Sequence, residues 1–260
     1  MKSKSAVLIF LMAALLAACA QSQRSLTAQR EKDPQYQYEK AVVCMNAGLT
    51  DYAFPYLNQA LVLAPRHYQS LNLLGLAHMI KGNLPAAVAA LEKCVAIAPD
   101  FSDGHNNLAT ALQESGQIEK AEAEYRKAFA LDENYNASFN LAKIEFQRNN
   151  PEAALEYAAK SLRKNAKSLL AFNLQGLILE SLNRLDEATA SYEAAMKLVP
   201  GELNVEFNLA IVYTKKEDFA RARSMLTSIQ RRLRERTPAQ AGDAELKKRV
   251  DETLKRIENR

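Results

Sequence analysis

The sequence predicts an all-α protein built from consecutive pairs of short helices, an α-solenoid. Three observations support this prediction. Ala and Leu dominate the 260 residues, only eight Gly and eight Pro interrupt them, and β-branched residues are sparse, a composition that favours helix. Apolar residues make up 48% of the chain, which is enough to bury a core and excludes wholesale disorder. The third observation is an internal repeat of about 34 residues, a period typical of helical arrays.

The repeat is defined by a small residue that is followed twelve positions later by alanine. Successive alanines lie 34, 34, 33, 34 and 34 residues apart. Small residues at these two places let two helices approach closely, and a Leu or Tyr four residues after the alanine is expected to fill the space between them. Ala158 is the exception at that last place. The six pairs are Ala41/Ala53, Gly75/Ala87, Ala109/Ala121, Ala142/Ala154, Gly176/Ala188 and Ala210/Ala222.

Turns separate the two helices of each repeat. In the second repeat we expect helices over Tyr68–Lys81 and Pro85–Ile97, joined at Gly82 and Asn83. One pair cannot bury its apolar face alone, so neighbouring repeats must supply the missing core. This pattern resembles the tetratricopeptide repeat, and the resemblance covers about Pro34 to Arg236 in six units. Further turns are marked by residues that tolerate or require non-helical backbone, namely Gly48, Gly116, Asn149-Asn150-Pro151 and Asn183.

The resemblance implies a concave groove lined by the first helix of each repeat, with positions two, five, nine and twelve facing inward. Aromatic and Met side chains there would supply contact area and Asn side chains would bond a peptide backbone. We therefore expect a protein partner, bound as an extended segment or an amphipathic helix, although ordinary groove residues without a partner would give the same pattern. Lys143 is the only basic residue at positions five, nine and twelve, which argues against a clamp for a C-terminal carboxylate. The candidate groove residues are Tyr38, Met45, Asn72, Met79, Asn106, Phe139, Lys143, Phe146, Asn173 and Phe207.

A final helix is predicted from about Asp243 to Glu258, after a linker at 237–242. Asp243 is a suitable N-cap. Apolar residues at spacings of four, four and three line one side of this helix, while several lysines and arginines leave the other side polar. This pattern indicates a helix that caps the end of the stack, and partner docking is the alternative. The apolar residues are Leu246, Val250, Leu254 and Ile257.

Residues 1–18 resemble the signal peptide of a bacterial lipoprotein. Two lysines precede an apolar run of eleven residues, Ala6–Leu16, which is too short to span a bilayer. The run ends in Leu16-Ala17-Ala18-Cys19, which resembles a lipobox. In sequences similar to it, Cys19 takes a diacylglycerol, the chain is cut before it, and the new amine is acylated. By the same resemblance, Ala20 implies export to the outer membrane, facing the periplasm. A plain signal peptide followed by a chance cysteine is the alternative.

The predicted organisation is therefore a signal peptide at 1–18, a lipidated flexible tether at 19–33, six repeats at 34–236, and a linker with the capping helix at 237–260. Charge is uneven along the mature chain. Residues 215–260 carry fourteen Lys and Arg against eight Asp and Glu, whereas residues 19–214 carry eighteen against twenty-two. The densest basic run is Arg231–Arg236. A solvated helical face explains this run, and contact with anionic headgroups or an acidic partner is the alternative.

No residues are predicted to catalyse a reaction or to hold a metal or cofactor. The three histidines share no spacing, and HExxH, GxSxG and phosphate-loop patterns are missing from the sequence. Cys44 and Cys94 fall at packing positions on helices that another helix separates. We therefore expect buried thiols, because a disulfide needs Cα atoms within about 7 Å, although an oxidising periplasm would permit a bond. Nucleic acid is not expected behind an export signal, and no small-molecule substrate is expected either.

The signal, the lipobox, the repeat number and the total length together resemble the type IV pilus pilotins. Pilotins bind secretin subunits and promote their localisation and assembly in the outer membrane. This chain has no motif unique to pilotins, and it departs from several of them in having no Cys pair in its middle repeats. We expect a non-catalytic scaffold of this kind. The alternatives are an adaptor for peptidoglycan hydrolases or synthases and a scaffold for an envelope export complex, and a groove enzyme would need a nucleophile or base that the sequence does not offer.

Overall fold

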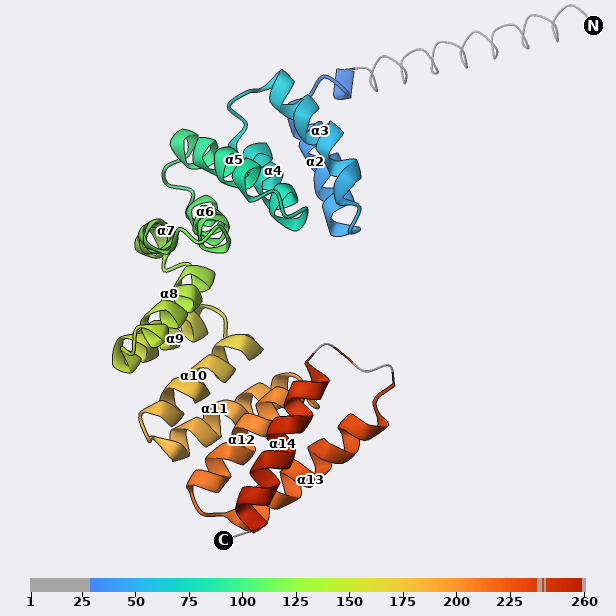
Figure 1. Ribbon diagram of the computed structural model, residues 1–260. Coiled ribbons are helices and arrows are strands. Elements are labelled where there is room, and N and C mark those ends of the chain that lie inside the picture. The colour runs from blue at the N-terminus through green and yellow to red at the C-terminus, as the bar shows by residue number, and fades with distance from the viewer. Residues whose placement is uncertain (1–28, 238–239, 241, 259–260) are drawn as a thin grey trace, which may run out of the picture. The chain divides into compact units, whose positions relative to one another are not determined.

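The computed structural model describes residues 29–237, 240 and 242–258. The predicted signal peptide, the Cys19 lipidation site and tether residues 19–28 lie outside the described residues. Within the described part every regular element is a helix, which confirms the predicted all-α class (Figure 1). The helices are α2 (Pro34–Asn46), α3 (Thr50–Leu63), α4 (Tyr68–Ile80), α5 (Leu84–Ile97), α6 (Ser102–Glu114), α7 (Ile118–Asp132), α8 (Tyr135–Gln147), α9 (Pro151–Lys164), α10 (Leu169–Ser181), α11 (Leu185–Leu198), α12 (Leu203–Lys215), α13 (Phe219–Glu235) and α14 (Asp243–Glu258).

The chain divides into two compact units between Glu124 and Tyr125, within α7. Unit 1 contains the pairs α2/α3 and α4/α5, then α6 and the start of α7. Unit 2 contains the end of α7, the pairs α8/α9, α10/α11 and α12/α13, and α14. Inside each unit a first helix packs on its own second helix, on the preceding second helix and on the preceding first helix, as α4 does on α5, α3 and α2. This stacking is that of an α-solenoid and confirms the predicted architecture.

Close approach of the paired helices depends on the small residues that define the repeat. All ten alanines of the predicted pairs are fully buried. The two glycines are equally necessary, because a Cβ at Gly75 would lie 2.4 Å from Cγ of Leu91, and one at Gly176 would lie 2.5 Å from Cε1 of Tyr192. Leu91 and Tyr192 are themselves fully buried between the helices, as the pattern predicts.

The turn between the two helices of a repeat requires a left-handed residue, and the chain supplies it in different ways. Gly82 has a φ of 72°, and the predicted turn residues Asn149 and Asn183 have φ values of 62° and 57°. In the last repeat Glu217 takes this place with a φ of 61°. The sequence did not predict this turn, because Glu is uncommon in the left-handed region.

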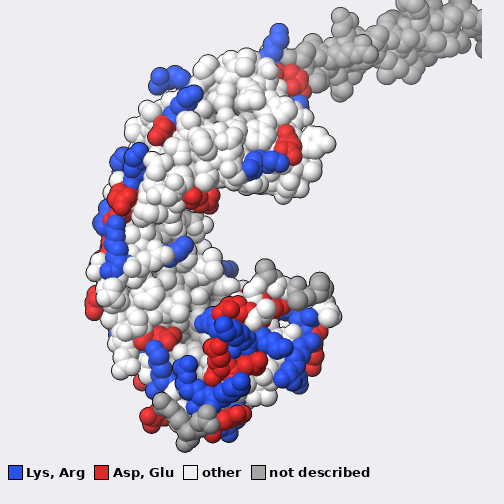
Figure 2. Space-filling model, viewed as in Figure 1, with Lys and Arg blue, Asp and Glu red and all other residues white. Residues whose placement is uncertain are grey.

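The C-terminal helix α14 closes the stack in the way the sequence predicts. It packs on α13 and α12, the place that the first helix of a seventh repeat would take. Leu246, Val250 and Ile257 are buried against the core of unit 2, together with Thr253, whereas Leu254 is only partly buried. The lysines and arginines of its other side are exposed, and Figure 2 shows charged side chains gathered over the C-terminal helices.

The end of the predicted tether is not free of the fold. Glu31 pairs with the Nζ atom of Lys40 at 2.7 Å and accepts from the side-chain amide of Gln37 at 2.7 Å. Asp33 caps α2 by accepting from the backbone N–H of Gln35. Residues 31–33 therefore belong structurally to the first repeat, because the two carboxylates there find a cation and two amide donors on α2.

Candidate functional site

The first helices of each unit form one surface, which we call the first-helix face, and the second helices form the other, the second-helix face. On the first-helix face of unit 1, the predicted groove residues Tyr38, Met45, Asn72 and Met79 are half-buried. The ring of Tyr38 packs edge-on against His67 with centroids 5.5 Å apart, and burial raises the pKa of the Tyr38 hydroxyl. These side chains lie on one face, as predicted, but much of their surface is already used within the unit.

Asparagines join neighbouring first helices. In unit 1, the Nδ2 atom of Asn107 on α6 donates to Oδ1 of Asn72 on α4 at 2.8 Å. In unit 2, Nδ2 of Asn208 on α12 donates to Oδ1 of Asn173 on α10 at 3.0 Å. Asn106 is only 6% exposed, and within the described residues its buried Oδ1 has no hydrogen-bond donor. The carbonyls of Asn72 and Asn173 thus hold the repeats together, which leaves them less free to bond a peptide than the sequence predicts.

The first-helix face of unit 2 carries the aromatic residues. Phe139 and Phe146 on α8 are half-buried against the cluster that contains Ala142, Leu174 and Ile178, and the Nζ atom of Lys143 lies 5.8 Å from the Phe139 ring centroid. Leu170 at position two of α10 is 63% exposed. Position two faces inward by the repeat pattern, so Leu170 is an apolar groove residue that the candidate set missed.

Phe207 is not a groove residue, contrary to the prediction. It is only 2% exposed, and the guanidinium carbon of Arg249 on α14 lies 4.4 Å from its ring centroid. The reason is that position five faces the next first helix, and α14 takes that place after the sixth repeat. Phe207 therefore contributes to the core of unit 2 and offers no surface to a partner.

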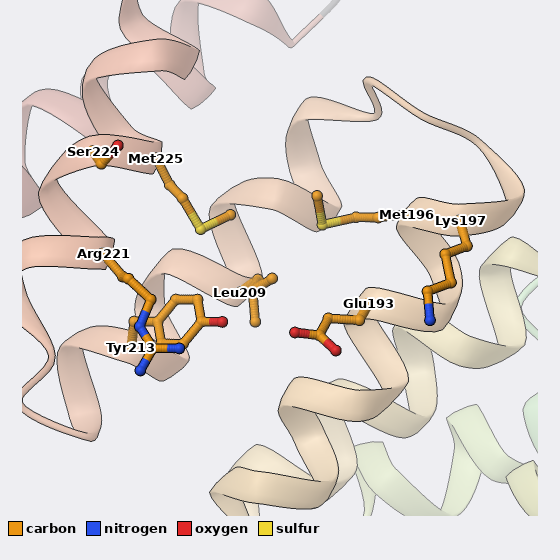
Figure 3. A pocket seen from close by; sticks show the side chains of 8 residues that line it. All are labelled: Glu193, Met196, Lys197, Leu209, Tyr213, Arg221, Ser224 and Met225. Atoms are coloured by element: carbon orange, nitrogen blue, oxygen red, sulfur yellow. The ribbon is translucent and has the colours of Figure 1, made fainter.

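A groove of about 450 Å³ lies on the second-helix face of unit 2, between α11 and α13 (Figure 3). Leu209 and Tyr213 of α12 form its floor, and Met196 and Met225 extend into it from its two sides. The guanidinium of Arg221 stacks on the Tyr213 ring at 4.8 Å. Such a lining suits a single large apolar side chain of a partner, because Met adapts its shape to what it contacts.

The equivalent groove one repeat earlier, between α9 and α11, differs in chemistry. It has a volume of about 410 Å³, but Gln175 and Ser191 stand where the apolar groove has Leu209 and Met225. The Ser191 hydroxyl donates to Oε1 of Gln175 at 3.0 Å. The apolar lining is thus not shared by the groove one repeat earlier.

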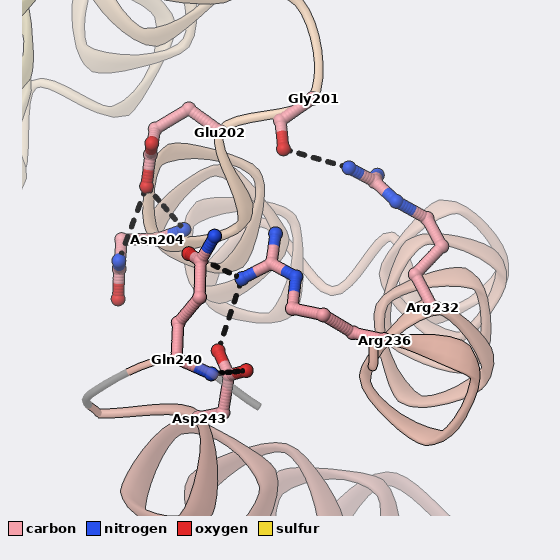
Figure 4. A network of polar contacts seen from close by, with 7 residues as sticks. All are labelled: Gly201, Glu202, Asn204, Arg232, Arg236, Gln240 and Asp243. Carbon is pink, nitrogen blue, oxygen red and sulfur yellow. Dashed lines mark hydrogen bonds and ion pairs between the residues drawn. The ribbon is translucent and has the colours of Figure 1, made fainter. Parts of the chain in front are cut away.

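Half of the basic run at the end of α13 has a structural role (Figure 4). Arg232 pairs with Oε2 of Glu206 at 2.5 Å. It also donates to the Gly201 carbonyl at 2.7 Å, as Figure 4 shows. Arg236 pairs with Oδ1 of Asp243 at 3.0 Å, so it holds the start of α14. The sequence suggested a solvated face here, and only the remaining arginines of the run fit that description.

The two cysteines of the described chain are free thiols. Cys44 is half-buried and Cys94 is buried, and burial raises the pKa of the Cys94 thiol to about 11. Within residues 29–258, as far as they are described, His, Cys, Asp and Glu form no cluster suited to a metal ion. In that same part of the chain, no helix combines the length and the apolar character needed to cross a bilayer.

Stacked helix pairs with these faces define a helical repeat protein of the kind that binds other proteins. Tetratricopeptide repeat models match residues 45–100, 106–168, 78–132 and 170–201, which together exceed half of the chain. The chain belongs to the tetratricopeptide repeat family.

Similar proteins come from type IV pilus systems. Over 154 residues the chain is 27% identical to the type IV pilus assembly protein PilF of Pseudomonas aeruginosa, a match that covers 58% of this chain and 61% of that protein. The chain thus matches about three fifths of the length of this relative. A solved structure of Pseudomonas aeruginosa PilF superposes with a TM-score of 0.73 at 19% identity, over 85% of this chain and 99% of that one. PilW, a widely conserved type IV pilus biogenesis factor, gives a TM-score of 0.69 at 15% identity, over 78% and 95% of the two chains. At these identities the structures show a shared fold.

Proposed function

We propose that this protein is a pilotin, a scaffold anchored in the outer membrane through a lipid on Cys19 that assists secretin assembly in type IV pilus biogenesis. The observation that carries the proposal is the similarity to PilF over 154 residues, in a chain whose residues 16–19 resemble a lipobox. The scaffold works without catalysis. Its binding energy comes from apolar and aromatic side chains on helical faces.

The first-helix face of unit 2 is the surface that we assign to the secretin segment. Phe139 and Phe146 are rigid aromatic side chains that are half-buried in the same helix, so they lose little entropy on binding. The cation of Lys143 beside Phe139 adds a polar contact at the edge of this surface. An extended or helical segment with apolar side chains at regular spacing would fit such a face.

The test measures secretin multimers in cells that carry variants of this protein. Truncation of an aromatic anchor costs about 2 kcal/mol or more, or roughly thirtyfold in affinity, so Phe139→Ala is expected to reduce multimers strongly. Leu131→Ala is the matched control, because Leu131 is 42% exposed on a second helix. Circular dichroism checks that both variants fold. Normal multimers with folded Phe139→Ala would remove this face from the mechanism.

Anchoring has its own test. Cys19→Ala is expected to block lipidation and to leave the precursor uncleaved, because both steps need the thiol of the lipobox cysteine. Gel migration and flotation of membranes measure this outcome. Unchanged migration and membrane retention after a carbonate wash would contradict the lipid anchor while leaving the assignment of the groove open to the multimer assay.

A further inference from the structure

The outer side of the first repeat carries a surface rich in tyrosine, in which Tyr36, Lys40 and Tyr56 are half-buried. On α2, Tyr36, Lys40 and Val43 follow one another at spacings of four and three, so they share one side of the helix. This side is opposite to that of Tyr38 and Met45, which face the rest of unit 1. Val43 is 67% exposed.

The surface continues onto α3 through Lys40. Its Nζ atom lies 4.9 Å from the ring centroid of Tyr36 and 5.0 Å from that of Tyr56. Tyr52 lies one turn before Tyr56 on the same side of α3 and is 68% exposed. We call these five residues, Tyr36, Lys40, Val43, Tyr52 and Tyr56, the tyrosine face.

The charge in the middle of the tyrosine face is paired. Lys40 is paired with Glu31 at 2.7 Å, and Asp51, the acid next to Tyr52, is paired with Lys81 at 2.9 Å. A surface of this kind has phenol groups and aliphatic area without an unpaired charge in its middle. Tyrosines with this mixed character gather where a protein meets the headgroup region of a bilayer.

The chain also arrives from the tether at this same place. Glu31 is bound to Lys40 in the middle of the tyrosine face, and only eleven residues separate it from Cys19. At about 3.5 Å per residue, the chain between them reaches at most about 40 Å. A lipid on Cys19 would therefore hold the tyrosine face within a short distance of the bilayer surface, where its local concentration at the membrane is high.

We infer that the tyrosine face rests on the lipid headgroups, so that the first repeat lies against the membrane instead of hanging from a free tether. This inference deepens the proposed function, because it rests on the proposed lipid anchor. The occupant of the face is the lipid surface itself. The contact orients the first repeat.

The chain contains no Trp, so a single introduced Trp reports its own surroundings. Tyr52→Trp and Val43→Trp place reporters on the tyrosine face from two different helices, so one remains if the other variant misfolds. Ile118→Trp is the control, because Ile118 is 37% exposed two repeats further along unit 1. The lipidated full-length protein is reconstituted into vesicles of phosphatidylcholine and phosphatidylglycerol, with and without brominated acyl chains.

The expected result is that emission of the Tyr52→Trp and Val43→Trp proteins shifts to shorter wavelength and is quenched by brominated lipid, while emission of the Ile118→Trp protein is not. Proteins that float with the vesicles but show no quenching at either face position would overturn the inference and leave the anchor intact. Equal quenching at all three positions would overturn it as well, because the contact would then not be specific to this face.

Failure to float would instead contradict the lipid anchor. The same variants, starting at residue 19 and tethered to nickel-chelating lipid through an N-terminal histidine tag, then decide the question for the face alone. In that arrangement also, quenching at positions 43 and 52 without quenching at position 118 supports the inference. An absence of quenching at positions 43 and 52 overturns the inference.

Discussion

Arg232 should contribute far more to stability than the arginine before it in sequence. Its guanidinium donates to the Glu206 carboxylate at 2.5 Å and to the Gly201 carbonyl at 2.7 Å, while the Glu206 side chain is only 12% exposed. Removal of Arg232 leaves a shielded carboxylate and a carbonyl without their donor. Hydrogen bonds to charged groups contribute about 1.5–3 kcal/mol each, and the partial exposure of Arg232 screens the pair. We therefore expect Arg232→Ala to cost about 2 kcal/mol, or about 4–8 °C in Tm.

The assay is thermal unfolding followed by circular dichroism, with Arg231→Ala as the matched control. Arg231 is exposed, so its removal should change the free energy of unfolding by no more than about 0.5 kcal/mol. Glu206→Gln in the Arg232→Ala background should recover part of the loss, because a neutral amide is cheaper to bury than an unpaired carboxylate. Equal effects of Arg231→Ala and Arg232→Ala would refute the structural role assigned to Arg232.

Three further predictions concern packing and pH. Gly176→Ala should lower the free energy of unfolding by about 1 kcal/mol, measured by urea titration. Overpacking against Tyr192 costs about 1–3 kcal/mol, and the higher helix propensity of Ala offsets about 1 kcal/mol of that cost. An unchanged midpoint would contradict the close contact. Deletion of residues 243–258 should cause aggregation, measured by size-exclusion chromatography, because it uncovers apolar side chains. Burial of each of them stabilises the fold by at most about 1.5–3 kcal/mol, less the entropy lost on ordering. Full solubility at an undiminished Tm would show that α14 is no cap. Burial lowers the pKa of His67, whose Nδ1 accepts from the Ser70 N–H, so the unfolded chain takes up the proton first and stability should fall as the pH drops from 7.5 through about 6.5. His67→Asn should reduce that pH dependence, and an identical slope in both proteins would assign it elsewhere.

The helix pairs could be predicted from the sequence because their packing is local. Alanine or glycine twelve residues apart must meet across one turn, and the burial of Ala41, Ala53 and their equivalents follows from that spacing. For the candidate groove residues, the sequence predicts the helix face on which each one lies but not its exposure. Their exposure depends on the helix that follows in the stack, and α14 covers Phe207 from more than thirty residues away in sequence.

Interactions between distant residues were beyond prediction for the same reason. Arg232 and Glu206 lie 26 residues apart, and nothing in the run Arg231–Arg236 distinguishes the arginines that find partners from those that do not. The apolar groove between α11 and α13 could not be predicted either, because it depends on the distance between these two second helices in the folded chain. Met196 and Met225 are unremarkable in sequence until α12 supplies a floor between them.

The position of α14 has a consequence for how such an array changes length. The helix α14 packs on α12 and α13 in the same way as α12 packs on α10 and α11. It therefore occupies the place that the first helix of a further repeat would occupy. Duplication of one 34-residue segment ahead of residue 237 would lengthen the array by a helix pair, and α14 would still pack on the exposed side of the last pair. The helix α14 is thus a transferable cap for such an array, provided that the residue facing Arg249 remains aromatic.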